Sequence, residues 1–258
     1  MKRIITALIL IPLFGYLVAL APQWLFLLGV SAVATLCFRE FAQLVAQHNI
    51  EAPGLFGYAA GLALILLPQR DASFFVVIAL LGMALALRSR DLTEALPYAA
   101  ALLLGVAYTY GALRCAVDLR AVSPYWALFA LSLNWAGDIA ALYVGKAFGR
   151  HKLAPRISPA KTWEGSIGSV VASVGYAAIY FPRLLPDVPL PEALLIAAAA
   201  NIAGQFGDLV ESALKRGAGV KDSGNLLPGH GGWLDRLDSS LFALPVVYFL
   251  VSNLRLRP

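Results

Sequence analysis

Acidic and basic side chains gather in one stretch of this sequence, between residues 208 and 238. Asp208 opens the stretch, and Asp235 and Asp238, three residues apart, close it, with Lys and Arg residues between them. Carboxylate oxygens are the hard ligands that Mg²⁺ prefers, usually one or two of them together with substrate phosphates. Lys and Arg can offset the remaining phosphate charge, and a Gly-rich backbone can approach phosphate oxygens closely. The stretch therefore predicts metal-assisted chemistry on phosphate groups.

A second candidate group lies within an apolar stretch, where Asn134 and Asp138 are four residues apart. On a helix this spacing places both side chains on one face. An ionisable residue within a membrane span is costly and indicates a functional site by default. A structural hydrogen bond between helices is the alternative interpretation.

A third group follows, in the basic segment 146–164. Ser158 and Pro159 favour a helix cap followed by a first-turn proline. Lys161 and a hydroxyl beside such a helix N-terminus would form a phosphate site. The alternative is that the basic residues of this segment only anchor the chain at anionic lipid head groups.

The elements that must position these residues are membrane helices. Of the 258 residues, 60% are hydrophobic and 14% are charged, whereas soluble domains have about 25% charged residues. A spanning helix needs about 20 mostly apolar residues. The sequence therefore predicts an all-α, polytopic membrane protein, one domain over residues 1–258, with motif-free spans in about 1–125 and catalytic spans and loops in about 126–258. The nine expected spans cover about 4–20, 22–38, 54–68, 73–87, 97–117, 123–145, 165–182, 190–207 and 239–254.

The placement of Lys and Arg predicts how these spans face the two sides of the membrane. With a cytoplasmic N-terminus, 14 of the 20 Lys and Arg residues fall on the inside, as the positive-inside rule requires. Both polar loops, 146–164 and 208–238, then lie on the cytoplasmic side. The basic net charge is explained by this placement, and no nucleic-acid partner is expected. The first apolar run could also be a secretory signal peptide, but a second apolar segment follows almost at once.

The C-terminal half contains dense motifs. They read Ser212-Ala-Leu-Lys215-Arg216, Lys221-Asp222, Pro228-Gly-His230-Gly231-Gly232-Trp-Leu-Asp235-Arg236-Leu-Asp238 and Ser158-Pro-Ala-Lys161-Thr-Trp-Glu164-Gly165. These motifs resemble those of the phosphatidate cytidylyltransferase family, also called CDP-diacylglycerol synthases. The similarity covers positions 212–238, and it extends upstream to Asp138 and to the segment 158–165.

The resemblance implies a reaction and a set of roles. CTP and phosphatidate would give CDP-diacylglycerol and diphosphate, with Mg²⁺ and a second cation such as K⁺, at the cytoplasmic face of the inner membrane. The family also implies a homodimer. Expected metal ligands are Asp208, Asp235 and Asp222. Expected catalytic residues are Lys215, Arg216, Lys221, His230 and Asp238. Expected substrate-binding residues are Asn134, Asp138, Ser158, Lys161, Ser212, Gly231, Gly232 and Arg236.

An ion-coupled transporter is the alternative from a different class, with Asp138 and Asp208 as coupling sites. That function predicts polar residues spread through several spans near mid-depth. In this sequence the polar residues crowd toward one face. An alcohol phosphotransferase that consumes CDP-lipids would need an Asp-Gly-x-x-Ala-Arg motif, which the sequence lacks.

Overall fold

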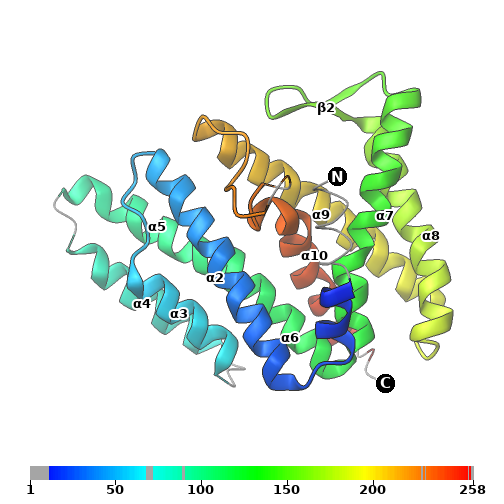
Figure 1. Ribbon diagram of the computed structural model, residues 1–258, viewed down its shortest axis with the longest axis horizontal. Helices are drawn as coiled ribbons and strands as arrows, with labels where there is room; N and C mark the ends of the chain where they lie inside the picture. The colour runs from blue at the N-terminus through cyan, green and yellow to red at the C-terminus, as the bar shows by residue number, and fades with distance from the viewer. Residues whose placement is uncertain are drawn as a thin grey trace. The chain divides into compact units, whose positions relative to one another are not determined.

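The structure is a computed structural model that describes residues 12–67, 72–88, 91–227, 229, 231–254 and 256. Its elements are almost all helical (Figure 1). Over these described residues, five helical segments are long and apolar enough to cross a membrane: Gln23–Gln47, Leu92–Val122, Pro124–Phe148, Trp163–Leu184 and Leu190–Gly217. The chain is therefore a multi-pass membrane protein. Every expected span that falls on described residues is helical, while the number nine stays a prediction. Of the span expected at 4–20, residues 12–19 are helical and 4–11 lie outside the described part.

The chain forms two compact units. Unit 1 contains Ala21–Arg114 and Leu214–Arg236, and unit 2 contains Leu13–Leu20, Cys115–Ala213 and Leu237–Pro258. The expected single domain over 1–258 stays a prediction.

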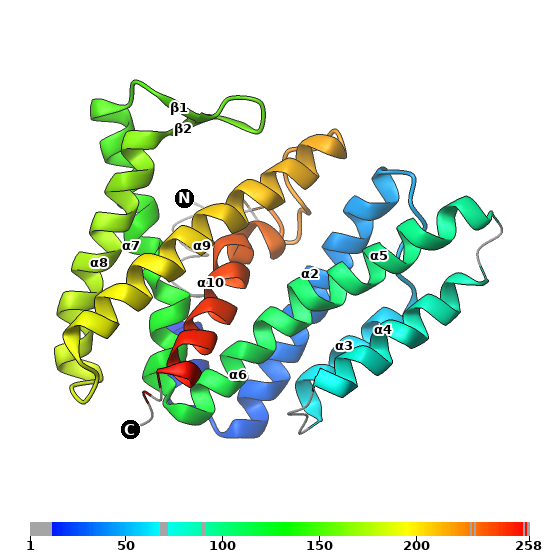
Figure 2. The ribbon, with the colours of Figure 1, turned by 180° about the vertical axis from the view of Figure 1, so that it is seen from behind.

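Unit 1 is built around α2 (Gln23–Gln47), α3 (Leu55–Leu66), α4 (Ala72–Ala86) and α5 (Ala95–Val106), which Figure 2 shows beside one another. A 3-10 turn, η1 (Leu92–Glu94), leads into α5, and a π-helical turn, η2 (Ala107–Gly111), joins α5 to α6 (Ala112–Val122). The Phe38 ring meets the rings of Tyr58 and Tyr110 at centroid distances of 4.9 and 5.5 Å. Tyr110 packs directly on Gly61 of α3. Small residues therefore let the helices of this unit approach closely, as is common in membranes.

Unit 2 centres on α7 (Pro124–Phe148) and α8 (Trp163–Leu184), which lie side by side in Figures 1 and 2. Ser123 caps α7, and its hydroxyl accepts a hydrogen bond from Tyr125 N, with Pro124 in the first turn. Glycines bring the two helices together. A Cβ at Gly165 would lie 2.8 Å from Ala141 O, and one at Gly168 would lie 2.9 Å from Val144. Helix α9 (Leu190–Gly217) and helix α10 (Leu234–Asn253) contribute to both units.

A β-hairpin connects α7 to α8, and it corrects one expectation from the sequence. Strand β1 (Lys152–Ala154) pairs antiparallel with β2 (Ser158–Thr162), with Lys152 opposite Thr162. The predicted helix cap at Ser158 is therefore wrong. Helix α8 begins at Trp163, and Thr162 is its cap, accepting a hydrogen bond from Gly165 N at 3.1 Å. A two-stranded ribbon consists only of edge strands, and these tolerate Pro159.

Replacement of Gly61 by Ala tests the close packing in unit 1. Helix propensity alone would favour Ala by about 0.5–1 kcal/mol. The added Cβ would overlap the Tyr110 ring, and overpacking usually costs about 1–3 kcal/mol. We expect a lower apparent melting temperature for the detergent-solubilised protein. Gly175→Ala on α8 is the control, because a Cβ there meets no atom within 4 Å. A stabilised Gly61→Ala variant would contradict the packing argument.

Candidate active site

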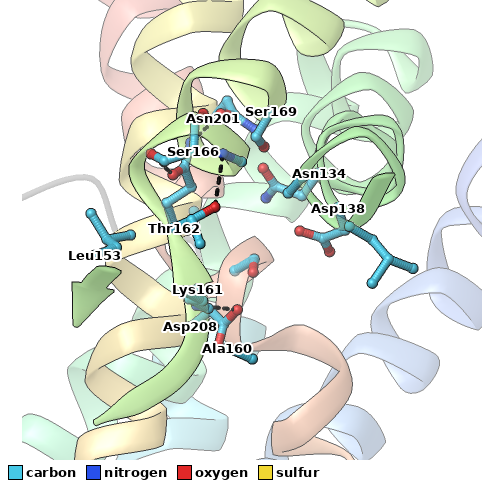
Figure 3. A pocket seen from close by; sticks show the side chains of 16 residues that line it. Asn134, Asp138, Leu153, Ala160, Lys161, Thr162, Ser166, Ser169, Asn201 and Asp208 are labelled. Atoms are coloured by element: carbon cyan, nitrogen blue, oxygen red, sulfur yellow. Dashed lines mark hydrogen bonds and ion pairs between the residues drawn. The ribbon is translucent and has the colours of Figure 1, made fainter. Parts of the chain in front are cut away.

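Unit 2 contains a polar cavity of about 280 Å³ beside the base of the hairpin. Figure 3 shows its lining, with Lys161 and Asp208 at one end and Ser169 and Asn201 at the other. Helix α7 supplies Asn134 and Asp138, as their four-residue spacing predicts. The polar lining is Asn134, Asp138, Lys161, Thr162, Ser166, Ser169, Asn201, Gln205, Asp208 and Ser239.

The charged end of this cavity is a lysine–aspartate pair. Lys161 Nζ lies 2.5 Å from Asp208 Oδ2, and the two side chains are 26% and 32% exposed. Lys161 lies on β2, one residue before the α8 cap Thr162, whereas Asp208 lies on α9. The second oxygen of Asp208 accepts a hydrogen bond from the Ser212 hydroxyl at 3.3 Å. The pair thus places a cation and a carboxylate at an accessible end of the cavity.

The other end of the cavity is a network of amides and hydroxyls. Asn201 Nδ2 donates to Ser169 Oγ at 3.0 Å, and Gln205 Nε2 donates to Asn201 Oδ1 at 2.7 Å. The Ser166 hydroxyl donates to Gln205 Oε1. A Cβ at Gly137 would lie 2.5 Å from both Asn201 Nδ2 and Ser169 Oγ. Gly137 therefore makes the room on α7 that the network fills.

Asn134 lies against this network but is not part of it. Its side chain is buried, and among the described residues neither its amide nitrogen nor its amide oxygen has a hydrogen-bond partner. A buried polar atom without a partner costs about 1–3 kcal/mol. Such a cost is typical of functional sites, where the structure is not optimised for stability alone.

Unit 1 holds the second group of expected site residues, around Asp235 in the first turn of α10. Lys215 Nζ lies 2.6 Å from Asp235 Oδ1. The other oxygen, Oδ2, accepts backbone hydrogen bonds from Ser223 at 2.9 Å and from Gly232 at 2.8 Å. Gly231 has φ of +76°, and a Cβ there would lie 2.6 Å from Asp235 Oδ2. Only glycine therefore suits this turn around the carboxylate.

The environment of Asp235 keeps it ionised. The side chains of Lys215 and Asp235 are 11% and 4% exposed. Burial by itself would raise the pKa of the Asp235 carboxyl, but the Lys215 ammonium and the two backbone N–H groups outweigh burial and lower it. A carboxylate with several donors and one cation is favoured in its charged form. The site thus holds a fixed negative charge at the end of an apolar helix.

Glu40 on α2 also belongs to this group, and sequence reasoning missed it. Its oxygens accept hydrogen bonds from the Ser223 hydroxyl and from the backbone N–H groups of Trp233 and Leu234. The available signal was an acidic residue within an apolar segment, which is by itself a reason to expect function.

The remaining expected site residues that the structure describes do not line the cavity. Ser158 lies on β2 and does not line the cavity, so its expected place at a helix N-terminus is wrong. Asp238 accepts a hydrogen bond from Ser239 N at 2.6 Å in unit 2. His230 lies outside the described residues. Four further charged residues are exposed: Arg216, Lys221, Asp222 and Arg236.

Comparisons with known proteins identify the family. The sequence pattern of the cytidylyltransferase family matches residues 1–254. The chain belongs to this family. A phosphatidate cytidylyltransferase of Bacillus subtilis is 34% identical over 97% of this chain and 97% of its own length. One of Staphylococcus aureus (strain COL) is 36% identical over 86% of this chain and 87% of its own length. One of Staphylococcus haemolyticus is 34% identical over 96% and 98%.

Both polar groups, around Asp208 and around Asp235, suit the chemistry of the cytidylyltransferase family. A cytidylyltransferase acts on a nucleoside triphosphate, so its site must bind several negative charges, and each group provides a buried or half-buried lysine. The transporter alternative is not supported, because the matching family and the relatives above are named as transferases.

The carboxylates of this cytidylyltransferase suit a magnesium ion chemically. Among the described residues, no group of three or more His, Cys, Asp and Glu could hold a metal ion. Mg²⁺ does not need such a group, since it usually takes one or two carboxylates and completes its shell with water and substrate phosphates. Asp208, partly exposed at the cavity, offers hard oxygen donors of this kind.

Replacement of Lys215 by Met tests the charge balance at Asp235. Removing one partner of a buried ion pair typically costs about 3–5 kcal/mol, because the other charge stays buried. We expect a markedly lower apparent melting temperature at neutral pH and a raised pKa of Asp235. Arg216→Met is the stability control, since Arg216 is exposed on the same turn of α9.

The difference in melting temperature between wild type and Lys215→Met should depend on pH, because the pKa of Asp235 is shifted in the folded protein. Because the folded-state pKa of Asp235 is lowered, the stabilisation by its charged form is present above the unfolded pKa, about 3.9. It is lost as the pH falls through the folded pKa. The gap in melting temperature between wild type and Lys215→Met should therefore narrow as the pH falls, and the wild-type contribution to it is lost below about pH 4. A gap that is independent of pH would contradict the charge explanation.

Proposed function

We propose that this chain transfers the cytidylyl group of CTP to phosphatidate, giving CDP-diacylglycerol and diphosphate. The observation that carries the proposal is the 34% identity, over 97% of both chains, with a protein named phosphatidate cytidylyltransferase. The multi-pass fold suits a lipid substrate. The two lysine–aspartate pairs suit substrates that carry phosphate.

The proposed reaction joins two anions. A phosphate oxygen of phosphatidate forms a bond to the α-phosphorus of CTP, and the bond from that phosphorus to the bridging oxygen breaks as diphosphate leaves. The attacking phosphate is already ionised at neutral pH, so no strong general base is required. Positioning and charge stabilisation then supply most of the rate enhancement.

The chain's own cations would hold these anions. Lys161, at the accessible end of the unit 2 cavity, would bind a phosphate that displaces it from Asp208. Lys215 holds Asp235 in position and can neutralise a phosphate brought beside it. The exposed Arg216, Lys221 and Arg236 would offset the rest of the charge. The hydroxyl of Ser212 orients Asp208, and the glycines 231 and 232 leave the backbone open around Asp235.

Metal binding is part of the proposal. Asp208, Asp235 and Asp222 would hold Mg²⁺, and the family resemblance adds a second cation such as K⁺. When bound, a divalent cation neutralises developing charge on phosphate oxygens. Asp138 and Asn134 would complete the polar lining. The proposed role of His230 is to shape the glycine-rich turn.

The proposed topology has nine spans, a cytoplasmic N-terminus and a C-terminus on the opposite side. It puts the hairpin and the 208–238 stretch at the cytoplasmic face of the inner membrane, where CTP is available. The excess of Lys and Arg in the inner loops supports this orientation. We also propose a homodimer, on the family resemblance alone.

Substitution of Asp208 by Asn tests the proposed chemistry. The amide keeps the size of the side chain but removes the charge that balances Lys161. We expect Mg²⁺- and CTP-dependent formation of CDP-diacylglycerol to fall at least about 100-fold, as is usual for a lost charged group in a reaction that depends on electrostatic stabilisation. Asp187→Asn, an exposed change in the 185–189 turn, should leave turnover unchanged.

The substrate assay offers purified protein each of the common nucleoside triphosphates with phosphatidate and Mg²⁺. Release of diphosphate together with CDP-diacylglycerol is expected with CTP. The proposed function is wrong if no nucleotide yields a nucleotide-linked lipid. Near-normal turnover in Asp208→Asn would instead remove only this residue from the site.

Cysteine labelling tests the proposed orientation. In a variant with Cys37 and Cys115 replaced by Ala, a single cysteine at Lys152 should react with a membrane-impermeant thiol reagent only after the membrane is opened. A single cysteine at Asp187 should react in intact cells. The two positions lie at opposite ends of α8, so identical labelling of both in intact cells would contradict the topology.

A further inference from the structure

Glu40 is a buried acidic residue in an apolar helix of the N-terminal half. Its exposed fraction is 1%, and its neighbours on α2, Phe38, Phe41 and Ala42, are buried as well. A carboxylate in such a position is costly unless donors surround it. The sequence shows no motif in this half of the chain that could supply hydrogen-bond donors to Glu40. Its donors come from a segment that is distant in the sequence.

The donors that the structure describes for Glu40 come from the segment 223–234, which contains the glycine-rich turn. Glu40 Oε1 accepts from Trp233 N at 3.0 Å. Glu40 Oε2 accepts from the Ser223 hydroxyl at 2.8 Å and from Leu234 N at 2.9 Å. Trp233 and Leu234 stand at the start of α10, where backbone N–H groups have no partner within the helix. Glu40 therefore caps α10 from another helix, and its negative charge suits the positive end of the helix dipole.

Two glycines show that the loop is shaped around this carboxylate. A Cβ at Gly224 would lie 2.6 Å from Glu40 Oε1, and one at Gly232 would lie closer still to Oε2. The backbone reaches the carboxylate only because these side chains are absent. Any larger residue at either position would push the loop away from α2.

The same loop residues also hold Asp235. Ser223 binds Glu40 through its hydroxyl and Asp235 through its N–H. Gly232 donates its N–H to Asp235, and the next two N–H groups along the chain go to Glu40. Three consecutive backbone N–H groups are thus divided between the two carboxylates, one to Asp235 and two to Glu40. A shift of the loop away from Glu40 would move the donors of Asp235 with it.

We propose that Glu40 is a positioning residue for the reaction, which fixes the 223–234 loop and the start of α10 so that Asp235 and Lys215 keep their working geometry. This inference rests on the proposed function for its catalytic consequence. It gives the N-terminal half a direct part in the site, beyond anchoring the chain in the membrane.

Replacement of Glu40 by Gln tests the proposal with little change in size. The amide turns its NH₂ group toward at least one of the N–H or O–H donors, so the loop loses part of its attachment. We expect kcat, measured on folded, monodisperse protein, to fall about 10- to 100-fold, the usual effect of losing a residue that orients a ligand. Hydrogen exchange of the 223–234 amides, measured without Mg²⁺ or substrate, should become faster while the 125–145 amides stay unchanged.

The matched control is Ser31→Ala on the same helix. Ser31 is also buried, but its hydroxyl has no hydrogen-bond partner in the part of the chain that the structure describes. This variant should keep both kcat and loop exchange. A Glu40→Gln protein with kcat within about twofold of the control would overturn the proposal, as would a lower kcat without faster loop exchange. That threshold is well below the expected loss.

A second variant keeps the test decisive if Glu40→Gln does not fold. Ser223→Ala removes only the hydroxyl that links the loop to Glu40 and leaves the N–H bond to Asp235 in place. It should change kcat and loop exchange in the same direction, by a smaller factor, and no change in either would overturn the proposal. If the wild type forms no CDP-diacylglycerol, the proposed function fails, while the exchange measurement still decides whether Glu40 holds the loop.

Discussion

The need to neutralise carboxylates at apolar helices governs the polar architecture of this protein. Asp235 is nearly buried, and its two oxygens are satisfied by one ammonium group and two backbone N–H groups. Within the described part of the chain, Glu40 accepts hydrogen bonds from three donors and pairs with no side-chain cation. Each arrangement offsets a desolvation cost of several kcal/mol per ion. The loop residues therefore fold around the carboxylates of Asp235 and Glu40, and the apolar helices hold these carboxylates in position.

Close helix packing makes this arrangement sterically feasible. In unit 2, Gly137 lets polar side chains of neighbouring helices approach α7, and Gly165 lets α8 approach the α7 backbone. The cavity beside them is consequently polar although the surrounding helices are apolar. In unit 1, Gly224, Gly231 and Gly232 do the same for a loop, because each would place a Cβ against a carboxylate. Absence of side chains is thus as important to the site as the charged residues themselves.

The two lysine–aspartate pairs suggest how a charged site stays folded before substrate binds. Lys161 lies against Asp208, and Lys215 lies against Asp235. In the proposed reaction a cation or a phosphate would take the place of one partner in each contact. The pair at the cavity is about one third exposed and can exchange its partner readily, whereas the pair in unit 1 is almost fully buried. The buried pair therefore has more to do with holding geometry than with capturing substrate.

Sequence alone determined the membrane class, the helical segments and the family, because apolar runs and dense motifs are local patterns. It also placed Asn134 and Asp138 on one face, since helical spacing fixes that without knowledge of neighbours. It failed at Ser158, where pairing with β1 overrode a local helix-start signal. Glu40 could not be found by spacing, because its partners lie more than 180 residues away in the chain. Only the tertiary structure decided which donors surround each carboxylate, since a buried charge is satisfied by whatever the packed helices bring beside it.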